Sequence, residues 1–206
     1  MNKRKQWLSL YTMFHPMKGY ELVKWDRSGS FIESACILLA LFLYIVSERQ
    51  VTGFIFNGNN ADDINVPVIF LVTIGTFLLW FVSNMAVCSF MDGEGKSREV
   101  WIASTYALIP YVLIGFIEIV LSNLFSIEAS PFLLILRFAA IAWSILLLAV
   151  GMYTVHQYSL KQTLANLSLT VAGIAIITFL LILVYSLFQQ VFVFLFTVYN
   201  EIMFRM

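Results

Sequence analysis

Five long apolar stretches constrain the fold of this chain more than any other feature of its sequence. They cover residues 31–46, 66–90, 100–124, 132–153 and 167–188, with short polar or turn-forming segments between them. A helix needs about 20 apolar residues to cross a hydrocarbon core of roughly 30 Å, and in lipid every backbone polar group must be paired internally. The sequence therefore predicts an all-α fold, a polytopic membrane bundle of five transmembrane helices.

The composition excludes a soluble domain of this size. Hydrophobic residues make up 61% of the 206 and charged residues only 12%, which leaves too little polar surface for a protein in water. Cys36 and Cys88 both fall inside apolar stretches. We therefore favour small buried thiols over a disulfide, which belongs to water-exposed oxidising compartments.

The basic residues predict how the bundle is oriented. Cytoplasmic segments of membrane proteins carry an excess of Lys and Arg. With the N-terminus inside and the C-terminus outside, only Arg49, Arg137 and Arg205 fall elsewhere, and the inner segments hold the other basic residues: Lys3, Arg4, Lys5, Lys18, Lys24, Arg27, Lys96, Arg98 and Lys161. We expect three parts, a cytoplasmic segment 1–30, a transmembrane domain 31–190 and an extracytoplasmic apolar arm 191–206.

The first 30 residues combine basic and aromatic side chains. Trp7, Leu10, Tyr11 and Phe14 recur at helical spacing until Pro16. This pattern predicts amphipathic helices on the inner leaflet, with aromatic residues at the headgroup level and lysines toward anionic lipid. The alternative is a partly ordered tail whose aromatic residues have no common face.

A charged, glycine-bearing turn, residues 92–99, separates the second apolar stretch from the third. Asp92, Gly93, Gly95 and the Lys96-Ser97 pair give it a superficial likeness to a phosphate cradle, but it lacks the upstream glycine that such a loop needs. We therefore interpret the turn as a cytoplasmic hinge whose charged side chains stay solvated.

The third stretch carries polar residues where lipid-facing ones would be expected. Ser104, Tyr111 and Glu118 are seven residues apart, so they lie on one helical face. Such a face must meet protein or water, because polar groups in hydrocarbon are costly. Pro110 removes a backbone hydrogen bond in mid-helix, which predicts a kink with local polar compensation.

Glu118 and Arg137 are predicted to form an ion pair. Each lies about six residues inside the outer end of its stretch, so two antiparallel neighbouring helices would bring the charges to the same depth, about 9 Å. The alternative is that Arg137 reaches the outer headgroups and Glu118 is protonated. Arg137, Ser144 and Gly151 are also spaced by seven, and Asn84 should face other helices.

Three further features favour ordinary structural roles. Asp62-Asp63 lacks the ligand spacing of a calcium loop, so a solvated acidic loop is the better interpretation. His156 has no second histidine nearby, which favours an interfacial side chain over a metal ligand. The apolar arm 191–206 is too short to cross again as a helix, so it either extends the fifth helix or docks on a partner.

No catalytic, cofactor-binding, metal-binding or nucleic-acid-binding motif is evident. There is no phosphate-binding loop, no His-Glu-x-x-His, no Cys-x-x-Cys and no nucleophile elbow. The basic residues lie beside the membrane and not on a separate basic domain. We expect a non-enzymatic protein without cofactors or nucleic-acid partners.

The turn and the following helix resemble the Yip family of small membrane proteins. The residues that carry the resemblance are Met91-Asp92-Gly93-Glu94-Gly95-Lys96 and the Tyr-x-Leu-x-Pro pattern of Tyr106-Ala107-Leu108-Ile109-Pro110. It covers residues 15–190 and implies five spans with a cytoplasmic N-terminus. The Asp-Leu-Tyr-Gly-Pro element of eukaryotic members, which associate with Rab-type GTPases, is not found here. The chain is therefore more similar to the bacterial branch, some of whose members are encoded beside ATP-binding-cassette carbohydrate importers.

The leading functional hypothesis is an accessory or regulatory subunit of another membrane complex. The resemblance implies an ABC-type carbohydrate transporter with its permease subunits as partners, in a bacterial cytoplasmic membrane. A second hypothesis is a small permeation unit, in which Ser104, Tyr111, Glu118, Asn84 and Arg137 line a polar path. Membrane shaping or lipid scrambling is left open by the amphipathic N-terminal segment.

Overall fold

A computed structural model describes residues 8–58 and 64–205, and throughout these residues the regular structure is helical. The calcium-site candidates Asp62 and Asp63, and the aromatic Trp7, lie outside the described residues. The elements in chain order are α1 (Leu8–Phe14), α2 (Pro16–Lys24), α3 (Phe31–Val51), α4 (Val66–Phe90), α5 (Ser97–Tyr106), α6 (Ile109–Leu124), the 3₁₀ turn η3 (Ile127–Ala129), α7 (Ser130–His156) and α8 (Leu160–Arg205).

Five helical stretches among the described residues are long and apolar enough to cross a membrane. They are α3, α4, the pair α5 and α6, η3 with α7, and α8. The predicted fold class is therefore confirmed, whereas the orientation of the termini stays a prediction. The largest differences from the predicted boundaries are that α3 continues past residue 46 to Val51, and that α8 begins at Leu160, ahead of residue 167, and continues past residue 188 to Arg205.

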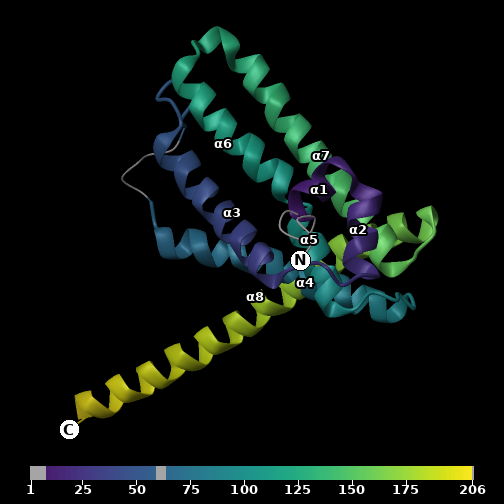
Figure 1. Cartoon of the computed structure of the whole chain (residues 1–206). Helices are drawn as coiled ribbons and strands as arrows, with labels where there is room; N and C mark the ends of the chain where they lie inside the picture. The colour runs from purple at the N-terminus through teal and green to yellow at the C-terminus, as the bar shows by residue number, and fades with distance from the viewer. Residues whose placement is uncertain (1–7, 59–63, 206) are drawn as a thin grey trace.

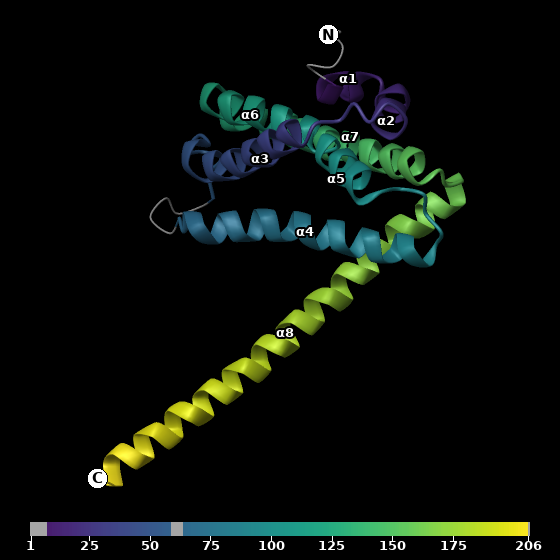
Figure 2. The same cartoon turned by 60° about the horizontal axis from the view of Figure 1, so that its bottom comes forward.

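The helices form a packed body from which one helix projects. In Figure 2, α3, α6 and α7 lie in one layer, with α4 below them and α8 crossing α4. The most extensively packed helix pairs are α6 with α7, α4 with α8, α2 with α7, α3 with α6 and α5 with α7. Proline begins several of these helices at a first-turn position, where its missing N–H is not needed.

The N-terminal helices α1 and α2 pack on this body. Tyr20 is completely buried and its hydroxyl donates to the backbone oxygen of Ala103 over 3.4 Å. Two helices with a break before Pro16 are present as predicted, but Tyr20 faces the protein interior, so it is not one of the aromatic side chains that could contact headgroups. Phe14 and Trp25 are exposed and remain candidates for that position. Tyr20 lies against Gly151, whose missing side chain makes room for the ring.

The last helix, α8, leaves the body after its first turns (Figure 1). It has 46 residues, which corresponds to about 69 Å at a rise of 1.5 Å per residue. Every residue from Phe179 to Tyr199 is exposed. Within this chain the apolar arm therefore continues the fifth helix, which is the first of the two alternatives that the sequence left open.

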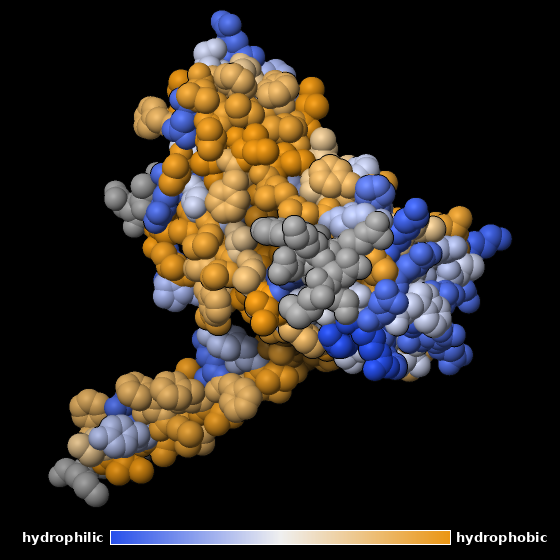
Figure 3. Space-filling view, viewed as in Figure 1, coloured by the Kyte–Doolittle hydropathy of each residue, from blue (hydrophilic) through white to orange (hydrophobic). Residues whose placement is uncertain are grey.

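The largest group of hydrophilic residues on the face shown in Figure 3 lies at one end of a largely apolar body. Figure 3 shows hydrophilic residues gathered where α2, the turn between α4 and α5 and the turn between α7 and α8 meet. Lys24, Lys96 and Arg98 belong to this end, which is the one predicted to be cytoplasmic. At the opposite end the turns after α3 and α6 come together.

Candidate functional site

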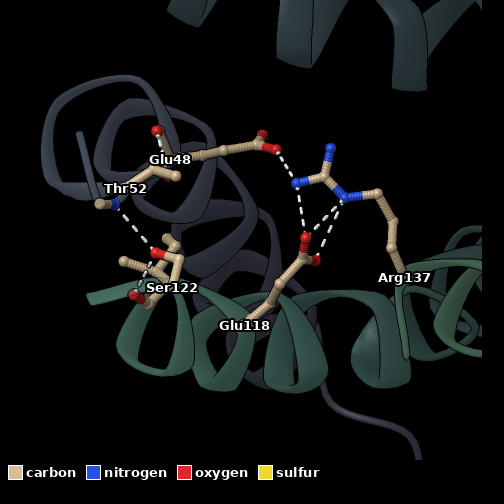
Figure 4. Close-up of polar contacts among 7 residues, drawn as sticks. Glu48, Thr52, Glu118, Ser122 and Arg137 are labelled. Atoms are coloured by element: carbon tan, nitrogen blue, oxygen red, sulfur yellow. Dashed lines mark hydrogen bonds and ion pairs between the residues drawn. The ribbon is translucent and has the colours of Figure 1, made fainter. Parts of the chain in front are cut away.

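Arg137 on α7 lies between two carboxylates, Glu118 on α6 and Glu48 on α3 (Figure 4). Its Nε donates to the two carboxylate oxygens of Glu118 over 2.9 and 3.1 Å. Its terminal Nη2 donates to Oε1 of Glu48 over 2.6 Å. Charge-assisted bonds to two oxygens of one carboxylate fix both distance and orientation. The predicted ion pair between Glu118 and Arg137 is therefore present, and it is one half of a charged triad formed by Glu48, Glu118 and Arg137.

The antiparallel turn at η3 explains how Glu118 meets Arg137. It joins the end of α6 to the start of α7, and the two helices are extensively packed. Glu48 was missed because the first apolar stretch ended at residue 46 in the sequence, which left Glu48 in the following loop. In the structure α3 continues for another turn, so Glu48 points toward α7 from helix and not from loop.

A glycine and a tyrosine hold α3 close to α6 beside the charged triad. A Cβ added at Gly115 would lie 2.4 Å from Cε2 of Tyr44, so only glycine leaves room for this ring. Tyr44 is 1% exposed and meets Tyr111 edge to face, with the ring centroids 5.3 Å apart. This contact brings α3 near enough for Glu48 to reach Arg137.

At the same end of the bundle, side chains of α6 form hydrogen bonds with backbone groups at the ends of α3 and α6. The Ser122 hydroxyl accepts the N–H of Gly53 over 2.9 Å and donates to the backbone oxygen of Ile119 over 2.7 Å. Asn123 Nδ2 donates to the backbone oxygen of Val51 over 2.8 Å. These bonds satisfy polar groups at the ends of α3 and α6, which would otherwise be left without partners.

A cavity of about 170 Å³ adjoins the charged triad. Glu118 and Arg137 line it together with hydroxyl groups of Thr52, Ser122 and Ser130. The side chains of Glu118, Glu48 and Arg137 are 12, 25 and 41% exposed. Two carboxylates and one guanidinium leave one negative formal charge. The arrangement can fasten three helices by charge while part of the guanidinium stays open to the cavity and the surface.

Asn84 belongs to a second cluster, which is buried and formally neutral. Its Nδ2 donates to Oδ1 of Asn166 over 2.9 Å and to the hydroxyl of Thr170 over 3.1 Å, both on α8. Cys88 Sγ lies 3.1 Å from Nε2 of His156 and accepts from Nδ2 of Asn166 over 3.4 Å. This amide cluster, made of Asn84, Cys88, His156, Asn166 and Thr170, joins α4 to α7 and α8. The prediction that Asn84 faces other helices is confirmed.

His156 corrects the prediction of an interfacial histidine. It is 1% exposed, because the glycines of the turn after α4 fold over its ring. A Cβ added at Gly95 would lie 2.5 Å from Nδ1 of His156, and one at Gly93 would lie 2.4 Å from the hydroxyl oxygen of Tyr158. Tyr158 stacks on His156, and burial raises the pKa of its phenol above the usual range. Within residues 8–58 and 64–205 no three His, Cys, Asp or Glu side chains are placed to hold a metal ion.

Lys24 fastens the turn to the rest of the bundle. Its Nζ donates to the backbone oxygens of Glu94 and Val155 over 3.0 and 2.8 Å. It also pairs with Glu99 over 3.5 Å, and both side chains are less than 10% exposed. The side chains of Asp92 and Glu94 are exposed as predicted. The turn itself is not a free hinge, because a buried lysine from α2 ties it to the end of α7.

Pro110 marks a break in the third span. The helix stops at Tyr106 and restarts at Ile109, and the N–H of Tyr111 donates to the hydroxyl of Ser144 on α7 over 3.2 Å. The predicted kink and polar compensation are both present. Ser104 accepts from Nε1 of Trp80 on α4 over 3.1 Å.

The expected polar residues are therefore divided among separate contacts. Ser104 faces α4, Tyr111 meets Tyr44 on α3, and Glu118 meets Arg137 on α7. Another pair went unnoticed in the sequence, since Tyr106 donates to Glu33 over 2.5 Å at the first turn of α3. The only signal for it was that Glu33 begins an apolar stretch and Tyr106 ends a helical segment before a proline.

Fold and contacts together define a multi-pass helical membrane protein fastened by one charged and one neutral polar cluster. The sequence model of the Yip1 domain matches residues 10–200. The chain therefore belongs to the Yip1 family. Neither a curated protein nor a solved structure matches it.

Proposed function

We propose that this Yip1-family protein acts without enzymatic activity, by binding another integral membrane protein as an accessory or regulatory subunit. The single observation that carries the proposal is the exposed apolar length of α8. Every residue from Phe179 to Tyr199 is exposed, and most of them are large and apolar. A helix that is apolar on all sides needs lipid or protein around it.

The length of α8 argues that lipid alone does not cover it. Its 46 residues extend about 69 Å, against a hydrocarbon core of roughly 30 Å. Gln189 and Gln190 divide the exposed part, as polar residues do at an interface. The segment 191–204 beyond them carries four exposed phenylalanines, Phe192, Phe194, Phe196 and Phe204. Such a surface outside the hydrocarbon is a candidate binding surface for protein.

The kind of partner follows from the family and not from the geometry. The resemblance to the bacterial branch implies a permease subunit of an ABC-type carbohydrate transporter, in a bacterial cytoplasmic membrane. The packed body supports a binding role, since the charged triad and the amide cluster fasten the first spans and the beginning of α8. The rest of α8 then projects from a packed body whose helices are held together by these two clusters.

Co-purification from native membranes tests this proposal. The full chain and a variant ending at Gln190 are solubilised in mild detergent, and the recovered proteins are identified by mass spectrometry. We expect a membrane protein at stoichiometric amounts with the full chain and its loss with the shortened one. The shortened variant must reach the membrane at wild-type level and keep its melting temperature.

Three outcomes count against parts of the proposal. A lone monomer recovered with the full chain contradicts a binding role. Recovery of only a second copy of this chain replaces the accessory role with self-association. A partner other than a transporter permease contradicts the transporter while leaving the binding role in place.

A further inference from the structure

A cavity of about 270 Å³ opens at the hydrophilic end of the molecule, apart from both polar clusters. Three cationic residues line it, Arg27 from the segment after α2, and Lys96 and Arg98 from the start of α5. Its apolar lining comes from Val23 and Ile102. A basic cavity with an apolar wall fits an anion that also carries a non-polar part.

The one acidic residue of the cavity, Glu99, is already neutralised. Its Oε2 pairs with Nζ of Lys24 over 3.5 Å and accepts the backbone N–H of Lys96 over 3.2 Å. Counting Lys24, four cations face one carboxylate. The positive end of the α5 dipole adds to this excess, because α5 begins at Ser97.

The fold holds the Arg98 side chain in position and gives Arg27 an unusual backbone conformation. Arg98 donates to the backbone oxygen of Gly29 over 3.0 Å, and its guanidinium lies 5.7 Å from the centre of the Phe31 ring. Arg27 has φ of 49°, a left-handed conformation that residues other than glycine rarely adopt. Gly29 lies against Ile102, since a Cβ there would be 2.7 Å from its Cγ2.

The cavity lies beside the start of α3, the first apolar helix. Phe31 and Ile32, the first residues of α3, are exposed, and so is Trp25. Residues of this kind occupy the boundary between headgroups and hydrocarbon. We propose that the cavity formed by Arg27, Lys96 and Arg98 binds a phosphate ester. Its source is either the headgroup of an anionic phospholipid or a soluble phosphorylated molecule, because both offer the same oxygens to these cations.

Lipid binding by two charge-matched variants tests the proposal. The first variant combines Arg27→Gln with Lys96→Gln, both exposed residues that none of the ion pairs among the described residues includes. The control combines Lys18→Gln with Lys161→Gln, exposed lysines outside this cavity. Each protein is purified in neutral detergent, and circular dichroism and melting temperature must match wild type before binding is measured.

Two ligand series distinguish the sources. In the lipid series, short-chain phosphatidylglycerol and phosphatidylcholine are titrated and counted by native mass spectrometry. In the soluble series, inorganic phosphate and glycerol 3-phosphate are titrated by calorimetry. We expect the cavity variant to weaken binding of the anionic ligand about tenfold, and the control to change it less than about twofold.

The outcomes either identify the source of the phosphate ester or overturn the proposal. Loss confined to phosphatidylglycerol identifies a lipid headgroup, and loss in the soluble series identifies a soluble phosphate ester. Equal loss in the cavity and control variants overturns the proposal, since the effect is then one of total charge. Absence of anion binding to the wild-type protein in both series overturns it as well.

Discussion

The charged triad and the amide cluster both hold three helices together, the first with ions and the second with neutral polar groups. Each joins three helices, α3, α6 and α7 in one case and α4, α7 and α8 in the other. The side chain of Arg137 is 41% exposed, whereas Asn84, Asn166 and Thr170 are completely buried. The ions lie where part of the Arg137 side chain stays accessible at the surface of the bundle, and the amides and hydroxyls lie where no surface is accessible.

The difference follows from the cost of removing each group from water. A buried ion keeps a penalty of several kcal/mol even when paired, whereas a hydrogen-bonded amide loses much less. A cavity of about 170 Å³ adjoins Glu118 and Arg137, and water in it would lower that penalty for the charged triad. Removing a partner from each cluster should therefore have unequal effects, and the following changes test that inequality.

Replacing Arg137 with methionine should give the largest loss. It leaves Glu48 and Glu118 close together without their shared cation, at the depth of a membrane span. Breaking a buried pair typically costs 3–5 kcal/mol, and the partial exposure of this triad reduces that to about 3 kcal/mol. Unfolding by SDS titration in mixed micelles measures the change.

Exchanging the charges of Glu118 and Arg137 distinguishes the contribution of this pair from that of Glu48. With Glu118→Arg and Arg137→Glu combined, the original pair is restored in reverse, but the new carboxylate faces Glu48. Stability should therefore recover only in part, and adding Glu48→Gln should recover more of it. If Glu48→Gln makes no difference in the exchanged protein, Glu48 does not couple to position 137 and the triad is only a pair.

Gly115→Ala should have the next largest effect, at about 2 kcal/mol. The added Cβ would lie 2.4 Å from the Tyr44 ring, so α3 must move away from α6. This movement withdraws Glu48 from Arg137 and leaves the amide cluster in place. Gly75→Ala on α4 is the control, because nothing lies within 4 Å of a Cβ there. Equal stability of the two variants would show that the charged triad does not depend on this close packing.

The sequence predicted those features that depend on local pattern or on depth in the membrane. Apolar length predicted the five spans, and equal distance from helix ends predicted that Glu118 meets Arg137. Pro110 predicted the interruption of the third span. In each case one physical constraint acts on a short segment or on two adjacent helices, so no knowledge of the remaining fold was needed.

The contacts that were missed depend on segments far apart in the chain. Glu48 comes from a helix that continues beyond its apolar residues, which hydropathy alone ends too early. The sequence predicted that Lys24, like the other N-terminal lysines, faces anionic lipid, but its side chain is buried because α2 packs on α7. His156 is buried only because two glycines of a distant turn fold over it. Such positions require the tertiary arrangement to be known first.

The smallest expected effect comes from Asn84→Leu, which tests the contribution of the amide cluster. The change removes bonds to Asn166 and Thr170 but leaves no charge unpaired. Hydrogen bonds between membrane helices are worth on average about 0.6 kcal/mol each, so losing these two should cost about 1 kcal/mol, one third of the loss for Arg137→Met. Thr73→Val on the same helix is the control, since the Thr73 hydroxyl bonds to Ile69 within α4 and its loss should change stability little. If Asn84→Leu is as damaging as Arg137→Met in the same SDS titration, the buried amides are as costly to disrupt as the ions, and solvent access does not explain where the two clusters lie.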